Sequence, residues 1–494
     1  MPLNSQFVLG AGSDGQAVGQ PLRLANRHGL IAGATGTGKT VTLQRLIETF
    51  SDAGVAVFAA DVKGDLCGLG AVGMPQGKVA ERIASMPWLN HQPQAYPVTL
   101  WDVHGQSGHP LRTTLSEMGP LLLGALLELT DSQQAALYAA FKVADREGLL
   151  LLDLKDLKAL LGYLKDNPQV LGEDSALFTN TSAQALLRRL AGLEQQGAEA
   201  LFGEPALQLE DLLHPDRDGR GRVHLLDATR LVHEAPKVYA TFLLWLLAEL
   251  FEQLPERGDA DKPVLALFFD EAHLLFQGTP KALQERLEQV VRLIRSKGVG
   301  VYFVTQSPGD LPDDVLAQLG LRIQHGLRAF TAKEQKALRA VADGFRPNPA
   351  FSTLNVLTEL GIGEALVGTL EEKGTPAMVQ RVAIAPPQSR IGPLNEAERA
   401  ALVRQSPLAG RYDKPIDRES AYELLTARAA QAAAEAPAQV STKTKTATQD
   451  QGLGQMAGEL LGGAMKSALR QAANQLGRQL VRGLMGSLMG GKKR

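Results

Sequence analysis

The chain has 494 residues, of which 44% are hydrophobic, and 51 basic against 53 acidic residues give a formal net charge of −2. Because the two charges nearly balance, the chain has no overall positive charge that would indicate nucleic-acid binding. Its single cysteine, Cys67, excludes an internal disulfide and a multi-cysteine zinc site. The nine histidines show no metal-ligand spacing, so no structural metal is expected.

Signals for secretion or membrane insertion are not evident. The N-terminal residues lack a basic region followed by an apolar one, which argues against a signal peptide. The longest apolar stretch, residues 242–251, is too short to span a bilayer and contains Glu249. Because one cysteine also suits a reducing compartment, we expect a cytoplasmic protein without a transmembrane segment.

A glycine-rich run near the N-terminus matches the phosphate-binding pattern G-x-x-x-x-G-K-[ST] at every fixed position. A short apolar run, 28–32, precedes it, and apolar residues at helical spacing follow it, as expected for strand, loop and helix. Backbone N–H groups of such a loop surround phosphate oxygens, so the sequence predicts ATP binding. Lys39 is expected to reach the β- and γ-phosphates, and Thr40 to ligate Mg²⁺. The predicted nucleotide-binding residues are Gly33, Ala34, Thr35, Gly36, Thr37, Gly38, Lys39 and Thr40.

Later apolar runs end in acidic residues. Residues 55–61, 98–102 and 223–227 each end in aspartate, and 263–269 is followed by Asp270 and Glu271. Repeated buried strands of this kind predict a mostly parallel, doubly wound α/β sheet whose ligands gather at the carboxyl ends of the strands. Between them, helix-period segments from about 115 to 213 predict an inserted helical subdomain.

The acidic pair predicts the chemistry of the site. Asp270 is expected to hold Mg²⁺ through its water shell, and Glu271 to polarise the attacking water as general base. Gln306 ends the next predicted strand, 299–306, where its amide could sense the γ-phosphate or orient the water.

Two arginines precede that strand on a predicted helix, 281–296. Arg292 and Arg295 are three residues apart and therefore share a helix face. Either could act on the ATP of a neighbouring subunit, where a guanidinium neutralises developing charge. Each could instead pair with Glu285 or Glu288, and the sequence does not choose between them.

Together, these motifs resemble the bacterial HerA-like helicase family of the HerA/FtsK superfamily, of the YjgR type. The resemblance rests on the loop 33–40, on Asp270-Glu271-Ala272-His273, on residues 290–306, and on Ile416 to Glu423. It implies a three-layer RecA-like core, dependence on ATP and Mg²⁺, and a usually hexameric ring that pumps double-stranded DNA. One departure is that only 32 residues precede Gly33, where founding members carry a β-barrel domain.

The expected organisation has six parts. These are the first part of the ATPase core (1–114), the helical subdomain (115–213), the second part of the core with the acidic motif (214–400), a C-terminal family extension (401–426), a flexible linker (427–452) and a basic amphipathic tail (453–494). From 440 onward, nine basic residues face Asp450 and Glu459. The tail is expected to self-associate, or to bind a surface, a nucleic acid or a partner protein.

Two rival functions remain at this point. A protein-remodelling or secretion motor would share every catalytic residue and differ only in its pore-lining side chains. A nucleotide-gated scaffold would bind ATP without hydrolysing it, and the intact Lys39 and Glu271 argue against that reading.

Overall fold

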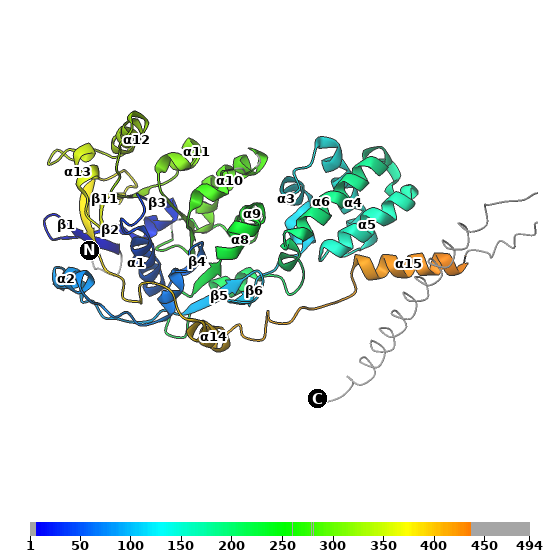
Figure 1. Cartoon of the computed structure of the whole chain (residues 1–494), viewed down its shortest axis with the longest axis horizontal. Helices are drawn as coiled ribbons and strands as arrows, with labels where there is room; N and C mark the ends of the chain where they lie inside the picture. Colours follow the sequence, from blue (N-terminus) through cyan, green and yellow to red (C-terminus); the bar gives the residue numbers. More distant parts are fainter. Residues whose placement is uncertain (1–5, 259, 278, 280, 436–494) are drawn as a thin grey trace, which may run out of the picture. The chain divides into compact units, whose positions relative to one another are not determined.

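The computed structural model describes residues 6–258, 260–277, 279 and 281–435, and its centre is a 12-stranded sheet (Figure 1). The spatial order of the strands is β2-β1-β12-β11-β10-β3-β9-β8-β4-β7-β5-β6. The strands are β1 (Gln6–Gly12), β2 (Ala17–Pro21), β3 (Gly29–Ala32), β4 (Ala56–Asp61), β5 (Val98–Asp102), β6 (His109–Pro110), β7 (Val223–Asp227), β8 (Leu265–Phe269), β9 (Val299–Thr305), β10 (Leu321–His325), β11 (Glu364–Gly368) and β12 (Gln380–Ile384).

The part of the sheet from β10 to β6 is parallel throughout. Strands β3, β4, β5, β8 and β9 are buried along their whole length, as expected for parallel strands covered on both faces. Ala32 pairs with Thr305 and Phe269 with Phe303, so the carboxyl ends of β3, β9 and β8 lie at one edge. The predicted mostly parallel α/β fold is confirmed.

Helices cover both faces of the parallel part. Alternate residues of β8, Leu265 and Leu267, belong to the core on the side of α9 and α10, while Ala266 and Phe268 belong to the core on the side of α1. The α-helices are α1 (Lys39–Asp52), α2 (Lys78–Ala84), α3 (Leu115–Leu126), α4 (Asp131–Glu147), α5 (Leu154–Asp166), α6 (Asn180–Gln195), α7 (Leu209–Leu213), α8 (Thr229–Glu234), α9 (Pro236–Gln253), α10 (Lys281–Leu293), α11 (Asp313–Leu316), α12 (Ala332–Asp343), α13 (Thr353–Glu359), α14 (Glu396–Gln405) and α15 (Ala421–Glu435).

The remaining strands are antiparallel, which the sequence did not predict. Strands β11, β12, β1 and β2 follow one another outward from β10. The residues before the phosphate-binding loop thus form a hairpin on the sheet. Gly10 permits its close pairing with β12, because a Cβ there would lie 2.0 Å from the carbonyl oxygen of Ala383.

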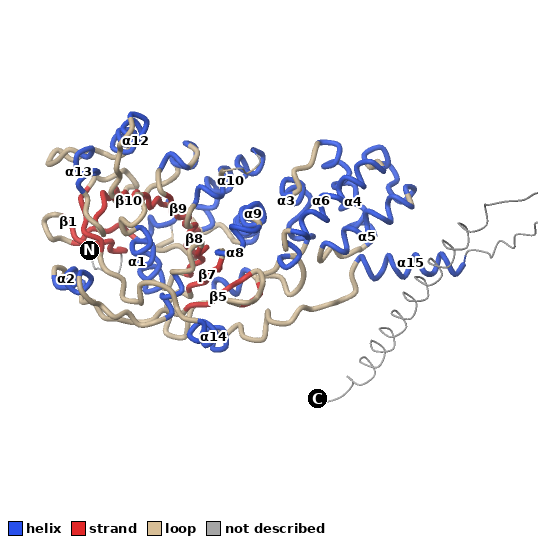
Figure 2. Tube along the Cα trace, in the orientation of Figure 1, coloured by secondary structure: helices blue, strands red, loops and turns tan. Residues whose placement is uncertain are grey.

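Helices α3 to α6 form a group of their own between β6 and β7 in the chain (Figure 2). Their leucine-rich faces join the core that lies over α9, and capping boxes begin α3, α4 and α5. The segment 406–420 leads to α15, and on the way Arg418 donates two hydrogen bonds to Glu204, at 2.6 and 2.7 Å.

The predicted linker, 427–452, differs from the structure at its start, because α15 continues as far as Glu435. Two features favour this helix: alanine has the highest intrinsic helix propensity, and Ala421 and Leu425 are buried in the main core. Residues 436–452 and the predicted basic tail, 453–494, lie outside the described residues. None of the helices in the described ranges combines the length and apolar character of a membrane span.

Candidate active site

The phosphate-binding loop connects β3 to α1 as predicted. Gly33, Gly36 and Gly38 have φ values of 153°, 78° and 112°, which disfavour other residues. A Cβ on Gly33 would also lie 2.5 Å from the Cβ of His325. These glycines leave a cradle of backbone N–H groups at the N-terminus of α1, which fits a polyphosphate.

Lys39 lies in this cradle. Its ammonium donates hydrogen bonds to the carbonyl oxygens of Gly33, at 2.6 Å, and Ala34, at 3.0 Å. Burial and the nearby Lys63 lower the pKa of Lys39, although Glu271 and Asp270 oppose the shift. Thr40 follows it in the first turn of α1.

The acidic pair lies at the carboxyl end of β8, at the same edge as the loop. Asp270 is buried, and chiefly this burial raises its pKa to about 6. Glu271 has a φ of 47°, a left-handed conformation that is strained for a residue with a side chain. Its Oε2 is buried and accepts no hydrogen bond from the described residues, with His273 Nδ1 3.4 Å away. A carboxylate with a free buried oxygen fits a group that accepts a proton from water.

Lys63 was not predicted as part of the site, yet it contacts both acids. Its ammonium lies 2.7 Å from Glu271 Oε1 and 3.9 Å from Asp270 Oδ2. Burial lowers the pKa of Lys63, but Asp270 and Glu271 outweigh burial and raise it above its usual value. A cation therefore already lies where the acidic pair attracts one.

Lys63→Met is expected to lower the melting temperature of the nucleotide-free protein and to enlarge the rise in Tm caused by Mg-ATP. Without the ammonium, Asp270 and Glu271 repel each other until a cation arrives. Differential scanning fluorimetry with and without Mg-ATP measures both effects. Lys78→Met, on an exposed residue of α2, is the matched control and should change neither value. A smaller rise than in the wild type would contradict this role.

Three other acids at strand ends have structural partners. Asp61 accepts hydrogen bonds from the backbone N–H groups of Lys63, Gly64 and Leu66, and so shapes the loop that carries Lys63. Burial and Asp65 raise the pKa of Asp61 to about 7. Asp102 and Asp227 likewise accept hydrogen bonds from the loops that follow β5 and β7.

Gln306 directly follows β9, between the phosphate-binding strand and the acidic strand. Because Ala32 pairs with Thr305, Gln306 lies level with Gly33, and its side chain is exposed. The turn after it is fixed by Asp310, which accepts hydrogen bonds from Thr305 Oγ1 at 2.7 Å and from the Ser307 N–H at 2.9 Å. This position suits the predicted sensor, whose role stays a prediction.

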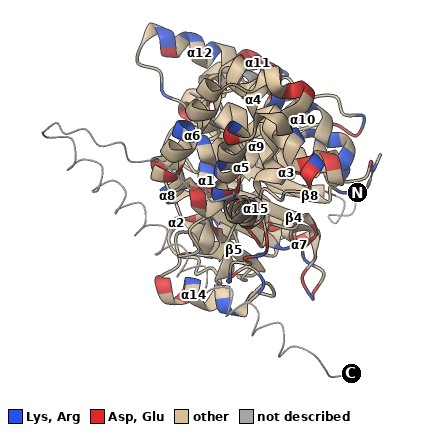
Figure 3. Cartoon of the chain, turned by 90° about the vertical axis from the view of Figure 1, so that its right-hand side faces the viewer, with Lys and Arg blue, Asp and Glu red and all other residues tan. Residues whose placement is uncertain are grey.

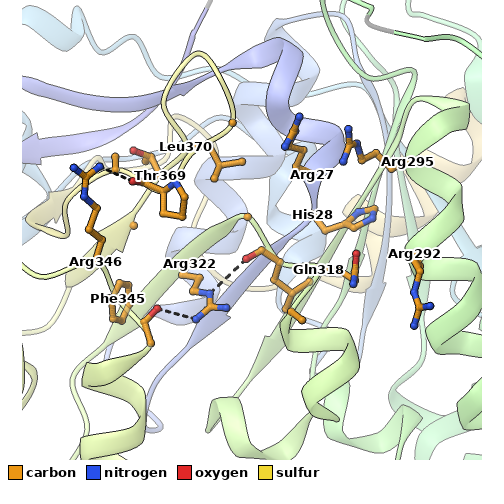
Figure 4. A pocket seen from close by; sticks show the side chains of 18 residues that line it. Arg27, His28, Arg292, Arg295, Gln318, Arg322, Phe345, Arg346, Thr369 and Leu370 are labelled. Atoms are coloured by element: carbon orange, nitrogen blue, oxygen red, sulfur yellow. Dashed lines mark hydrogen bonds between the residues drawn. The ribbon is translucent and has the colours of Figure 1, made fainter.

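Arg292 and Arg295 lie at the opposite edge of the sheet. Both are exposed and line a cavity of about 340 Å³ beside the starts of β3 and β10 (Figure 4). Neither forms an ion pair with Glu285 or Glu288 in the described part of the chain, where Glu285 pairs with Lys281. The structure therefore does not bring them to the phosphate-binding loop of their own chain.

His28 fixes the helix end that carries these arginines. Its Nε2–H donates to the Val291 carbonyl at 2.8 Å, and its Nδ1 accepts from the Val301 N–H at 3.0 Å. Burial lowers the pKa of His28 to about 4, so the ring is neutral, as these two bonds require. Arg322, in the same cavity, donates to the carbonyls of Gly344 and Leu316, which gives it a structural role.

His325 was also missed by sequence reasoning, and it links β10 to the phosphate-binding helix. Its Nδ1–H donates to the Glu364 carbonyl at 2.9 Å, and its Nε2 lies 2.9 Å from Thr42 Oγ1. Burial lowers the pKa of His325 to about 4, so the ring is neutral and its Nε2 accepts a hydrogen bond from the Thr42 hydroxyl. The Ala34 N–H also donates to the carbonyl of Gly326, at 3.2 Å.

The fold and the site define a P-loop ATPase with a RecA-like core. The family model described as "Helicase HerA-like C-terminal" matches residues 6–494. The chain therefore belongs to this HerA-like helicase family, and with it to the P-loop ATPase motors of the HerA/FtsK type. No curated protein is significantly similar to the chain in sequence.

Several solved structures are similar to the chain. The plasmid coupling protein TrwB in complex with the ATP analogue ADPNP is 16% identical, with a TM-score of 0.50, over 75% of this chain and 88% of TrwB. VirB4 of Thermoanaerobacter pseudethanolicus is 18% identical, with a TM-score of 0.46, over 77% of this chain and 96% of VirB4. The cytoplasmic domain of the type VII secretion ATPase EccC of Thermomonospora curvata is 17% identical, with a TM-score of 0.30, over 85% of this chain and 32% of EccC. The likeness to TrwB bears on the fold alone.

Proposed function

We propose that the chain is an ATP-hydrolysing ring motor that moves double-stranded DNA. The observation that carries this proposal is the division of the site between two sheet edges. The loop with Lys39, the acidic pair and Gln306 gather at one edge, and Arg292 and Arg295 lie at the other.

The residues at the first edge fit ATP and Mg²⁺. The glycine cradle and Lys39 would hold the phosphates, while Thr40 and Asp270 would hold the metal, which supplies charge neutralisation at the phosphoryl group. Glu271 accepts the proton of the attacking water, and Gln306 orients that water. TrwB has been solved with ADPNP and with ADP and Mg²⁺, which supports this choice of ligands.

A ring would bring the two edges together. A head-to-tail interface places one edge of a subunit against the opposite edge of its neighbour. Repeating this contact produces a closed ring when the rotation between neighbouring subunits divides a full turn evenly. Arg292 or Arg295 would then complete the neighbour's ATP site. A homo-hexamer is the ring size that the family implies.

Duplex DNA is expected to stimulate ATP hydrolysis at low salt, where phosphate contacts are strongest. The rate of phosphate release is measured with and without duplex, on protein whose oligomeric state is established by native mass spectrometry. Lys39→Ala protein is the negative control. Hydrolysis that responds to an unfolded protein but not to duplex would favour a secretion or remodelling motor. A nucleotide-gated scaffold would show binding without turnover.

A further inference from the structure

We propose that residues 326–343, the loop after β10 together with α12, form the surface that grips duplex DNA. This inference rests on the proposed function and adds to it the part of the chain that contacts the substrate. Four basic residues in this segment are exposed, namely Arg328, Lys333, Lys336 and Arg339. We call this segment the basic arm.

The charge of the basic arm is directed outward. Lys333, Lys336 and Arg339 recur at intervals of three along α12 and span about 9 Å of its length. The opposite side of the helix, with Leu338 and Ala342, packs in a small core with α13 and β11. Figure 3 shows the basic residues on α12 at the upper end of the molecule. A rigid row of cations at this spacing suits the phosphates of a duplex.

The two acids of the basic arm, Glu334 and Asp343, offset only part of this charge, because four basic residues against two acidic ones leave a net charge of +2. Glu334 is used to begin the helix, because its Oε2 accepts the N–H groups of Phe330 and Thr331, both at 2.8 Å. These backbone bonds lower the pKa of Glu334, and Asp343 lies at the far end of α12. The middle of the arm is therefore left positive.

Phe330 distinguishes the basic arm from an ordinary solvated helix face. Phe330 is 83% exposed, the largest value among the large hydrophobic residues that the structure describes. A single exposed aromatic ring is common on protein surfaces and needs no explanation by itself. The feature that sets Phe330 apart is its place in the chain between two exposed cations, Arg328 and Lys333. The partner that fits this arrangement is DNA. Proteins that insert an apolar side chain into a groove of duplex DNA hold the phosphate backbone with basic residues beside it.

The basic arm is also joined to the nucleotide site. It begins directly after His325, which bonds Thr42 of the phosphate-binding helix, and its first residue, Gly326, accepts the Ala34 N–H. A cavity of about 250 Å³ separates the inner face of α12 from residues 307–309, which follow Gln306. The helix therefore has room to shift when nucleotide changes the loop or the sensor, and this would convert hydrolysis into movement of bound DNA.

The test compares two triple variants of the full chain. K333A/K336A/R339A removes the cations of α12. The control K78A/R404A/K414A removes three exposed cations elsewhere, namely Lys78 on α2, Arg404 on α14 and Lys414 after α14. Fluorescence anisotropy of a labelled 30-base-pair duplex is measured over a salt series, with ADPNP present. The first variant is expected to bind about 10- to 100-fold more weakly, and its log–log salt slope to fall by about one per lost phosphate contact. The second should bind like the wild type.

Phe330→Ala is expected to reduce the stimulation of hydrolysis by duplex at least about fivefold and to leave the DNA-independent rate unchanged. Phe330→Trp should retain stimulation, because it keeps a large apolar ring that can enter the groove. Unchanged affinity and slope in K333A/K336A/R339A, or an equal loss in the control, would overturn the assignment while leaving the motor intact. A wild-type protein that hydrolyses ATP without binding duplex would refute the proposed function itself. If the first variant instead loses binding of an unfolded protein such as casein, the basic arm is a protein-contacting surface and the DNA assignment fails.

Discussion

Glu271→Gln is expected to retain ATP binding and to lose hydrolysis by about 10²- to 10⁴-fold. The amide keeps the size of the side chain and its position after β8, but it cannot accept the proton of the attacking water. ATP binding and ATP hydrolysis can be measured on the same preparation. Binding of a fluorescent ATP analogue shows whether the phosphate-binding loop is intact, and the rate of phosphate release measures the chemical step.

The matched control is Glu252→Gln, on an exposed residue of α9. It makes the same chemical change away from the site and should keep the wild-type rate. If Glu271→Gln protein hydrolysed ATP at the wild-type rate, another group would have to be the general base. Loss of both ATP binding and hydrolysis would show that Glu271 supports the cradle rather than the chemical step.

Arg295→Ala or Arg292→Ala is expected to lower the rate of hydrolysis by about 10³- to 10⁵-fold, the range found where an arginine stabilises phosphoryl transfer. The structure places both at the edge opposite their own Lys39, so the effect should operate between subunits. Arg286→Ala is the matched control. Arg286 lies on α10 with Arg292 and donates a hydrogen bond to Gln289 at 2.9 Å, and its replacement should leave the rate of hydrolysis nearly unchanged.

Mixed rings test whether the arginine acts in trans. Rings co-expressed from Glu271→Gln and arginine-variant chains contain some interfaces in which one subunit supplies Glu271 and its neighbour supplies the arginine. These rings should hydrolyse ATP well above either variant alone. No recovery in mixed rings, with ring assembly verified by native mass spectrometry, would mean that the arginine serves its own subunit or none.

The parts of the site that could be predicted are those whose signal is local in the sequence. The loop 33–40 and the pair Asp270-Glu271 each need only a few consecutive residues and a flanking apolar strand. Lys63 and His325 could not be found in this way, because their partners are remote: His325 and Thr42 are 283 residues apart. Their contacts follow from the strand order of the sheet, which no local pattern encodes.

The antiparallel part of the sheet was missed for a similar reason. Strands β1 and β2 contain three glycines, Gly10, Gly12 and Gly19, which weaken the sequence signal of a strand. The partner of β1, β12, lies more than 360 residues later in the chain. The predicted helix 281–296 is observed as far as Leu293, so that α10 carries Arg292 while Arg295 lies in the 3-10 turn Ile294–Lys297 that follows it. The edge of the sheet at which this helix ends depends on His28 and on the position of β9.

The pairing of β3 has a consequence for how the protein is made. On both sides, β3 is bonded to strands that the ribosome produces far later, β9 and β10. The phosphate-binding segment thus leaves the ribosome before both of its neighbouring strands and has no partner strand until they follow. Contacts of such long sequence separation form slowly, and unpaired apolar strands invite aggregation in the meantime. Nascent chains of this protein therefore acquire their nucleotide site only after residue 325 has left the ribosomal tunnel.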